Sequence, residues 1–192
     1  IEYRLAPLYP FPAAIADAQT FVRFVRANSG RYGIDPAKIG AMGNSAGGHL
    51  ASMLGVASQA FDGGDPVRVD AVVDVCGLTD VRNPTETQYP ISMSFIEQFL
   101  GGPYAGSEER YALASPVAHA TERRCPFLIV HGSVDDVVPP SQSQLMHDAL
   151  TSAGGEARLI LLEGEGHTFS LKTWDRLRLE AASFFKEALG AS

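Results

Sequence analysis

A serine flanked by glycines is the residue of this sequence best suited to nucleophilic chemistry. Ser45 stands in the stretch GNSAG, two residues after Gly43 and two residues before Gly47. Glycines at these positions let a chain turn sharply from a strand into a helix, because larger side chains would collide with neighbouring backbone, and the turn pushes the serine oxygen outward. The pattern alone fits a nucleophile and a purely structural turn equally well, because matches to three fixed residues also arise by chance.

A serine hydroxyl is a weak nucleophile, so a base must take its proton and a third group must orient that base. Asp135 follows the apolar run PFLIV, and His167 follows the run ARLILLE. If both runs are strands of one parallel sheet, the loops after them emerge at the same carboxyl edge, where ligands usually bind. The sequence therefore predicts that Ser45 as nucleophile, Asp135 as acid and His167 as base meet there.

Other histidines and aspartates are weaker candidates for these roles. His49 lies in the same predicted helix as Ser45 and should point along it, and Asp136 is the rival acid. His131, at the end of a predicted strand, is expected to stabilise the acid loop through a hydrogen bond. Three more residues are expected to be solvent-facing, packing or capping residues: His119, His147 and Asp80. His131, Asp135 and Asp136 lack a recognisable metal-ligand spacing, so no metal and no cofactor is predicted.

Strands and helices in alternation must position these residues. The predicted strands are residues 1–5, 38–43, 69–77, 126–132 and 157–163, and the helices are one opened by Pro12 and residues 45–57, 141–153 and 172–189. This alternation is typical of a mostly parallel sheet with helices on both faces. The helix after Pro12 places Ile15, Ala18, Val22 and Val25 on one buried face. We therefore expect one α/β domain over residues 1–192, with about five strands.

Residues 79–124 interrupt the alternation with prolines and glycines around the short apolar helix SMSFIEQFL. A long insertion at such a position is more often functional than accidental. Aromatic side chains of this cap-like segment and of the segment after the base could line a substrate pocket, so we predict substrate contacts from Phe95, Phe169 and Trp174, and from Asn44 beside the nucleophile. The alternative is that Phe95 and Phe99 form the buried face of the short helix.

Composition excludes several classes of partner. The 192 residues carry a net charge of −7, which gives no electrostatic footprint for nucleic acid or anionic lipid. No apolar run approaches the roughly 18 to 20 residues that cross a bilayer, so we expect a soluble protein without a membrane span, either cytoplasmic or secreted. Cys76 and Cys125 fall at opposite ends of the predicted sheet, so both are expected to be reduced thiols.

Four segments resemble bacterial α/β-hydrolase esterases of the hormone-sensitive-lipase type and the related feruloyl and acetylxylan esterases. They are YRLAPLYPFPAAIADA before the elbow, GNSAGGHLA at the elbow, ASPVAHA before the acid strand and HGSVDDVVPPSQS in the acid loop. The resemblance covers the whole chain and implies the same three roles for Ser45, Asp135 and His167. It also implies that the backbone N–H of Ala46 is one oxyanion donor.

The resemblance fails upstream of residue 3. Members of this family carry there a His-Gly-Gly-Gly type motif, which supplies oxyanion donors, and several strands, so the chain looks N-terminally truncated. Losing such a donor typically costs about a hundredfold to a thousandfold in turnover. We expect strand 1–5 either to pair directly with the elbow strand or to leave an open edge that associates with a second copy, because unpaired edges template strand addition.

The expected function is that of a serine esterase acting through an acyl-enzyme on short-chain or aromatic esters, which include feruloyl, acetyl, aryl and polyester substrates. One alternative is a catalytically weak or silent module that acts by association. Another is a peptidase of the prolyl-oligopeptidase type, although such enzymes usually have a larger aromatic residue beside the serine, where this chain has Asn44 and Ala46.

Overall fold

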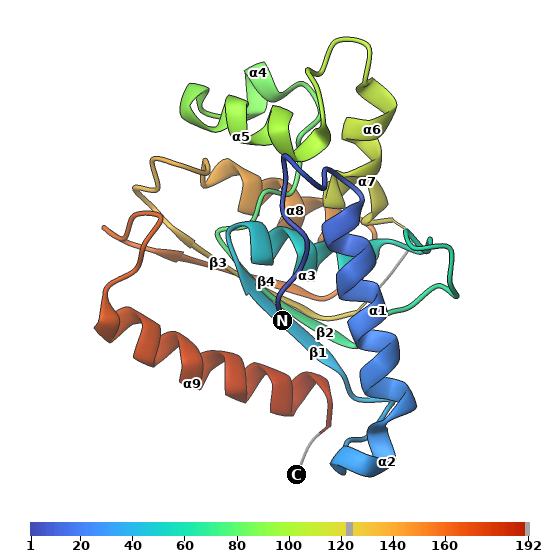
Figure 1. The fold of residues 1–192 in the computed structure, drawn as a ribbon. Coiled ribbons are helices and arrows are strands. Elements are labelled where there is room, and N and C mark those ends of the chain that lie inside the picture. Colours follow the sequence, from blue (N-terminus) through green and yellow to red (C-terminus); the bar gives the residue numbers. More distant parts are fainter. Residues whose placement is uncertain (122–124, 191–192) are drawn as a thin grey trace.

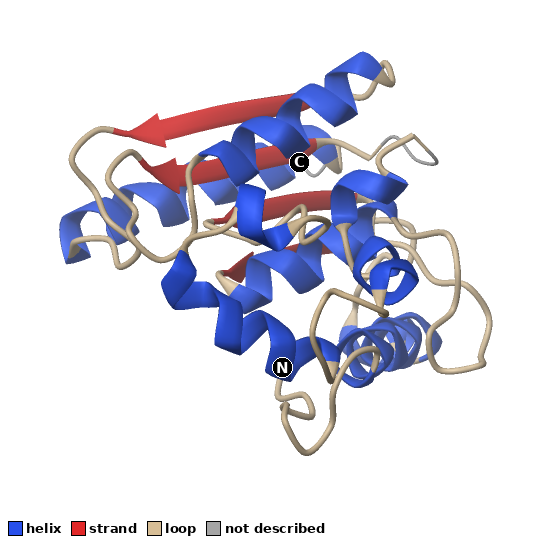
Figure 2. Ribbon diagram, turned by 90° about the horizontal axis from the view of Figure 1, so that it is seen from above, coloured by secondary structure: helices blue, strands red, loops and turns tan. Residues whose placement is uncertain are grey.

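The centre of the protein is a parallel β-sheet. The structure is a computed structural model, which describes residues 1–121 and 125–190. Within these residues the sheet has four strands in the order β1 (Gly40–Asn44), β2 (Ala71–Val75), β3 (Phe127–Gly132) and β4 (Ala157–Leu162). All neighbouring strands run parallel, so their carboxyl ends lie along one edge (Figures 1 and 2). Four of the predicted strands and the α/β fold class are confirmed.

The two central strands are buried on both faces, as apolar runs in parallel sheets usually are. Every residue of β2 and β3 is buried, whereas the outer strands β1 and β4 are partly exposed. Alternate side chains point to opposite faces. Val72 and Ile129 belong to the core on one face, and Val73 and Leu128 belong to the core on the other.

Helices cover both faces of the sheet. One face packs against α1 (Ala13–Ala27), α3 (Ala46–Val56) and α8 (Ser141–Ser152), and the other packs against α9 (Leu171–Ala188) (Figure 1). The short helix α2 (Ser29–Tyr32) follows α1. In α9 the buried residues Leu177, Ala181 and Phe184 recur at the spacing of one helix face. The four long helices expected from the sequence are therefore present, and none of the helices in the described residues is long and apolar enough to span a membrane.

The first five residues form no strand, so that prediction is wrong. The backbone N–H of Arg4 donates to Asp17 Oδ2 at 2.9 Å, and the Arg4 guanidinium binds the same carboxylate with Nη2 at 2.7 Å from Oδ1. Further along, the Phe11 N–H donates to the carbonyl of Phe99 at 2.7 Å. The N-terminal segment is therefore bound by contacts with α1 and the inserted segment, and the direct strand pairing expected between it and β1 does not form.

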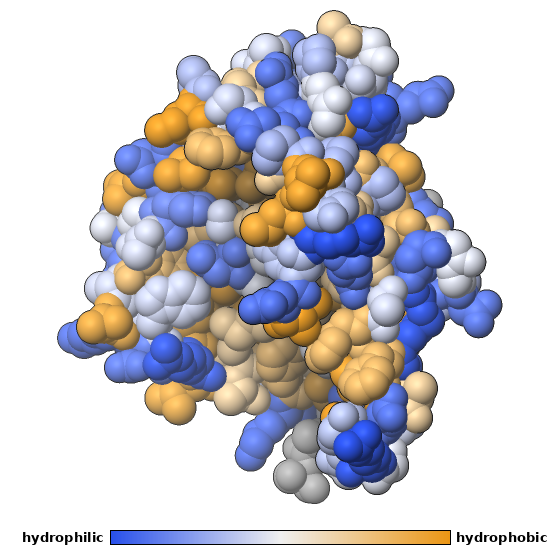
Figure 3. Space-filling model, viewed as in Figure 1, coloured by the Kyte–Doolittle hydropathy of each residue, from blue (hydrophilic) through white to orange (hydrophobic). Residues whose placement is uncertain are grey.

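Strand β1 pairs only with β2 among the described residues, so its other edge is open. Met42 on this strand is 42% exposed, and Phe21 and Phe24 on α1 are 44% and 48% exposed. Apolar surface is visible over α1 beside the sheet in Figure 3. An open edge flanked by apolar side chains is compatible with association with a second copy, which stays a prediction.

The segment predicted as an insertion consists of short helices that lie above the carboxyl edge of the sheet (Figure 1). They are α4 (Pro84–Thr87), α5 (Pro90–Leu100), α6 (Glu108–Leu113) and α7 (Pro116–His119). The end of the predicted insertion, residues 122–124, lies outside the described residues. Helix α5 faces the core with Ser92, Ile96 and Leu100. The alternative in which Phe95 and Phe99 form its buried face is wrong for Phe95, which is exposed, whereas Phe99 is partly buried and packs against the core.

Candidate active site

Ser45 occupies a sharp turn between β1 and α3. Its backbone is left-handed, with φ 55° and ψ −117°, which is strained for a residue with a side chain. A Cβ at Gly43 would collide with the carbonyl of Gly47, so glycine is required at that position. A Cβ at Gly47 would meet nothing among the described residues, whereas one at Gly48 would collide with Asp74 Oδ1. The expected elbow is present, but the second steric requirement falls on Gly48 and not on Gly47.

The structure brings the three predicted triad residues within hydrogen-bond distance. His167 Nε2 lies 2.9 Å from Ser45 Oγ, and His167 Nδ1 lies 2.7 Å from Asp135 Oδ2. An ionised carboxylate only accepts, so Nδ1 carries the proton, and Nε2 of the neutral ring is free to accept the proton of the serine hydroxyl. Each of the three residues follows the carboxyl end of a different strand: β1, β3 or β4.

Asp135 is buried and fully hydrogen-bonded. Its Oδ1 accepts from the backbone N–H groups of Val137 and Val138, both at 2.8 Å. Burial raises the pKa of the Asp135 carboxyl, but the hydrogen bonds from His131, from His167 and from these two N–H groups outweigh burial and hold that pKa well below its ordinary range. The group at the acid position is therefore an ionised carboxylate at neutral pH.

A cavity of about 500 Å³ opens beside Ser45. The inserted helix α5 contributes Phe95, Ile96 and Phe99 to its wall, and the loop after the acid contributes Val137 and Val138. This surface is mostly apolar. Of the predicted substrate-binding residues, Phe95 lines this cavity and is 66% exposed, and its contact with substrate stays a prediction.

The N-terminal segment forms another part of the cavity wall, which the sequence analysis missed. Tyr3, Leu5 and Tyr9 line the cavity, as does Arg4, whose charge is paired with Asp17. The sequence offers a signal, because the family resemblance begins at this segment, but the apolar pattern of residues 1–5 predicts a strand. The N-terminal segment therefore belongs to the wall of the cavity beside Ser45 and not to the sheet.

Three other predicted substrate contacts lie elsewhere. Phe169 and Trp174 pack against each other, with ring centroids 5.4 Å apart, in the core between the sheet and α9. Asn44 is exposed, and its amide donates to the carbonyl of Val75 at 3.2 Å. Neither the two aromatic residues nor Asn44 is among the residues that line the cavity, so we do not propose substrate contacts for them.

The alternative acids and bases are placed away from the serine. Asp136 is exposed, and Asp80 is paired with Arg82 at 2.7 Å. His119 is buried and bonds to the carbonyl of Leu113, whereas His147 lies beside Asp148 on α8. His131 is fully buried at the end of β3 and contacts Asp135 Oδ2 at 3.2 Å, as expected for a residue that supports the acid loop.

Cys76, His131 and Asp135 place three potential metal ligands within 4.8 Å of one another. Burial raises the pKa of the Cys76 thiol to about 12, so it is protonated at neutral pH, whereas a metal needs the thiolate. The carboxylate already accepts hydrogen bonds from the N–H groups of Val137, Val138 and His167, and Nε2 of His131 lies 3.2 Å from its Oδ2. These donors do not fit a metal site. Cys76 and Cys125 are not joined by a disulfide, as expected from the sequence.

Asp74 is a buried carboxyl that the sequence analysis missed. It accepts hydrogen bonds from the Ser52 hydroxyl on α3 at 2.7 Å and from the Gly77 N–H at 3.0 Å. Burial raises the pKa of Asp74, and the hydrogen bond from Ser52 lowers it by less. The signal was a charged residue inside the apolar strand AVVDV. Asp74 ties the helix that begins after the nucleophile to the turn after β2.

His49 lies in the same cavity wall as Ser45, but it does not serve as the base. Its Nδ1 is 2.8 Å from the carbonyl of Leu78, and its ring packs edge-on against Phe99 at 5.3 Å. Its Nε2 is buried and has no hydrogen-bond partner among the described residues. Burial lowers the pKa of His49, and the bond to Leu78 raises it by less, so the ring is neutral.

We predict a pH-dependent loss of stability from His49. In the unfolded chain a histidine gains its proton near pH 6.5. In the folded chain, burial delays protonation of His49 until the pH is lower. The free energy of unfolding should therefore fall by up to about 1.4 kcal/mol per pH unit as the pH drops below about 6.5. Urea unfolding of wild type and His49→Gln at pH 7.5 and 5.5 checks this, because the variant should show the shallower loss. Equal losses would contradict the expectation.

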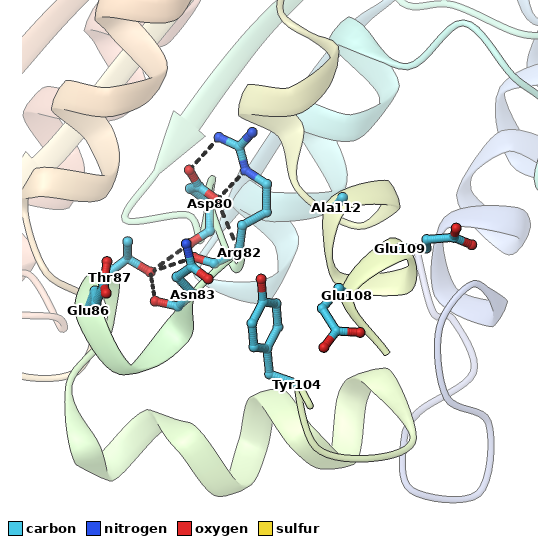
Figure 4. Close-up of a pocket in the computed structure, with 9 residues that line it drawn as sticks. All are labelled: Asp80, Arg82, Asn83, Glu86, Thr87, Tyr104, Glu108, Glu109 and Ala112. Atoms are coloured by element: carbon cyan, nitrogen blue, oxygen red, sulfur yellow. Dashed lines mark hydrogen bonds and ion pairs between the residues drawn. The ribbon is translucent and has the colours of Figure 1, made fainter. Parts of the chain in front are cut away.

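A polar cleft of about 470 Å³ lies in the inserted segment, away from the triad (Figure 4). Asp80 and Arg82 lie at one side of it, with Arg82 Nε 2.9 Å from Asp80 Oδ1. Tyr104 and Glu108 stand opposite them in the close-up. Val81, between the paired residues, lines the cavity with Ser45, so this short stretch separates the two hollows.

Comparisons with known proteins identify the family of this chain. The family model described as BD-FAE matches residues 1–150. Esterase LipC of Mycobacterium tuberculosis (strain ATCC 25618 / H37Rv) is 31% identical over 89% of this chain and 44% of LipC. Esterase LipQ of the same strain is 31% identical over 96% of this chain and 46% of LipQ. The chain thus spans about half the length of the curated relatives that it matches.

A solved structure described as a truncated form of carbohydrate esterase from gut microbiota matches with a TM-score of 0.84. Its sequence is 28% identical, and the match covers 99% of this chain and 73% of that chain. The predicted kinship with α/β-hydrolase esterases is confirmed by these relatives and by the parallel sheet. The family model matches well over half of the chain, so the chain belongs to the BD-FAE family and has the α/β-hydrolase fold.

Proposed function

We propose that this protein hydrolyses carboxylic esters through an acyl-enzyme formed on Ser45. His167 Nε2 takes the hydroxyl proton as Ser45 Oγ attacks the ester carbonyl, and Asp135 stabilises the imidazolium that results. His167 then gives the proton to the leaving alcohol. Water then attacks the acyl carbon as it gives a proton to the same nitrogen, the bond from that carbon to Ser45 Oγ breaks, and His167 returns the proton to Oγ as the acid leaves. The observation that carries the proposal is the distance of 2.9 Å between His167 Nε2 and Ser45 Oγ beside the cavity.

The backbone N–H of Ala46 is the proposed oxyanion donor. Ala46 is the first residue of α3, and the first N–H groups of a helix have no partner within the helix. The positive end of the helix dipole also lies there. The neighbouring Ser45 N–H is not available, because it donates to the carbonyl of Val75 at 2.8 Å. Negative charge that develops beside Ser45 therefore meets the N-terminus of α3.

The cavity favours esters with an uncharged, apolar acyl group. Its wall is dominated by aliphatic and aromatic side chains, and the charge of Arg4 is already paired with Asp17. An apolar group gains free energy with each methylene that it buries there. Butyryl and aromatic acyl groups should therefore be preferred to acetyl groups, and the esterase relatives support this class of reaction.

Acyl-chain preference tests the proposal. With p-nitrophenyl esters, kcat/KM should be about tenfold higher for butyrate than for acetate, because one or two methylenes in an apolar pocket discriminate by this order. Phe95→Ala should reduce the butyrate-to-acetate ratio of kcat/KM, because Phe95 lines the cavity. The control is Phe24→Ala, which removes another exposed ring on α1, outside the cavity, and should leave that ratio unchanged. Absence of hydrolysis of either ester would refute the proposed activity, and leave association without catalysis as the better account.

A further inference from the structure

The carboxylate of Asp135 lies between two imidazole rings. Its Oδ1 is fixed by two backbone N–H groups of its own loop. Its Oδ2, the oxygen that faces His167 at 2.7 Å, also lies 3.2 Å from Nε2 of His131. The loop backbone therefore holds one oxygen of the acid, whereas His131 is the second side chain that holds the oxygen used by the triad.

His131 is itself fixed at both ring nitrogens. Its Nε2 lies 3.0 Å from the carbonyl of Val138, and its Nδ1 lies 2.6 Å from the hydroxyl of Ser143 on α8. Carbonyl and carboxylate oxygens accept but do not donate, so Nε2 carries the proton, and in the neutral ring Nδ1 accepts from Ser143. The residue is fully buried, so no exposed rotamer competes with this orientation.

The titratable groups around this ring come from the neighbouring strand. Asp74 on β2 and Cys76 just after it interact electrostatically with His131 and with Asp135, respectively. Cys76, His131 and Asp135 present their polar atoms within 4.8 Å of one another. Burial raises the pKa of the Cys76 thiol to about 12, so that group remains neutral. The Cys76 thiol also hydrogen-bonds to Asp135, but a thiol is a weaker donor than an imidazole N–H and does not replace His131.

We propose that His131 is a positioning residue for the ester hydrolysis proposed above: it holds Asp135 Oδ2 toward His167 and ties the acid to the cavity wall at Val138. The inference rests on the proposed function of the triad. His131 touches neither substrate nor the reacting atoms. It acts through Asp135, because it is the second imidazole in contact with Oδ2, and through Val138, which lines the cavity with Ser45.

Loss of the His131 N–H should have two separate consequences. Asp135 loses a donor that fixes its orientation, and a small misplacement of a catalytic group lowers kcat by about tenfold to a hundredfold. The N–H also shares the negative charge of the carboxylate. Without it, the protonated form of His167 is favoured, so the acidic limb of the pH–rate profile should move up by about 0.5 to 1 pH unit. Simple destabilisation would reduce the amount of active protein without moving this limb.

The test compares three variants with wild type. His131→Leu removes the N–H, His131→Gln offers an amide N–H at a similar reach, and His147→Leu removes a partly exposed histidine of α8 that does not contact Asp135. The acidic limb of kcat/KM for p-nitrophenyl butyrate and the NMR titration midpoint of His167 are measured for each. We expect both to move up in His131→Leu, to return toward wild type in His131→Gln and to stay in place in His147→Leu.

Other outcomes separate this inference from the proposed function. If His131→Leu folds and keeps the wild-type kcat, acidic limb and His167 midpoint, the positioning role is overturned while the esterase stands. If wild type itself hydrolyses no ester, the proposed function fails, and the NMR midpoints still decide whether His131 acts on His167 through Asp135. If His131→Leu does not fold, Ser143→Ala is the substitute, because it removes the hydroxyl that binds His131 Nδ1. The titration midpoint of His167 should then move in the same direction but by less. An unchanged midpoint in Ser143→Ala would overturn the inference.

Discussion

Replacing Ser45 with alanine should lower kcat for p-nitrophenyl butyrate by at least about 10⁴-fold, because the acyl-enzyme cannot form without Oγ. The residual rate would come from the oxyanion donor and from binding in the cavity. Truncation of one partly buried hydroxyl leaves the backbone of the elbow unchanged, because Ser45 N and O keep their bonds to Val75 and His49. Turnover measured beside circular dichroism spectra separates lost chemistry from lost folding.

The matched control is Ser94→Ala on α5. Ser94 is exposed, and it is not among the residues that line the cavity. This variant should keep wild-type turnover, which would show that removing a serine hydroxyl from the inserted segment does not by itself lower activity. Turnover retained in Ser45→Ala would remove the nucleophile from the account.

Asp135→Asn should lower kcat by about 10⁴-fold, because His167 would then adopt the tautomer that cannot accept the proton of Ser45. Four N–H groups contact the Asp135 carboxylate: two backbone groups at Oδ1, and those of His131 and His167 at Oδ2; the Cys76 thiol hydrogen-bonds to it as well. An asparagine amide must turn its NH₂ group toward one of these pairs. If it faces the imidazoles, His167 must present Nδ1 as an acceptor, so its proton moves to Nε2, where it blocks transfer from Ser45.

Asp136→Asn is the control for this change. The neighbouring carboxylate is exposed, and it was the rival acid by sequence. Its replacement should leave kcat within about twofold, because surface substitutions away from special features have small effects. A large loss in Asp136→Asn together with a small loss in Asp135→Asn would reverse the assignment of the acid.

Most of the sheet and the triad could be predicted from the sequence, because both depend on strong local patterns. The runs that became β2 and β3 are apolar throughout, as strands buried on both faces must be. Once β1, β3 and β4 belong to one parallel sheet, the loops after them must share an edge, which brings Ser45, Asp135 and His167 together without any knowledge of tertiary contacts.

The errors arose where tertiary contacts decide. Residues 1–5 resemble a strand, but Asp17, on the next helix, captures the backbone N–H and the guanidinium of Arg4. Phe169 follows His167 by two residues, yet it lies in the core beside α9, because proximity in sequence does not specify which face of the sheet a segment covers. The cavity wall likewise combines segments far apart in the chain, so its full set of residues could not be read from local spacing.

Labelling with a fluorophosphonate tests the central claim most directly, because only an activated serine reacts. Wild type at pH 7.5 should gain one adduct per chain, mapped by peptide mass to the segment that contains Ser45, and Ser45→Ala should gain none. The distance of 2.9 Å between His167 Nε2 and Ser45 Oγ is the structural basis of this expectation. A folded wild-type protein that takes no label, or a Ser45→Ala variant that is labelled equally, would contradict the account.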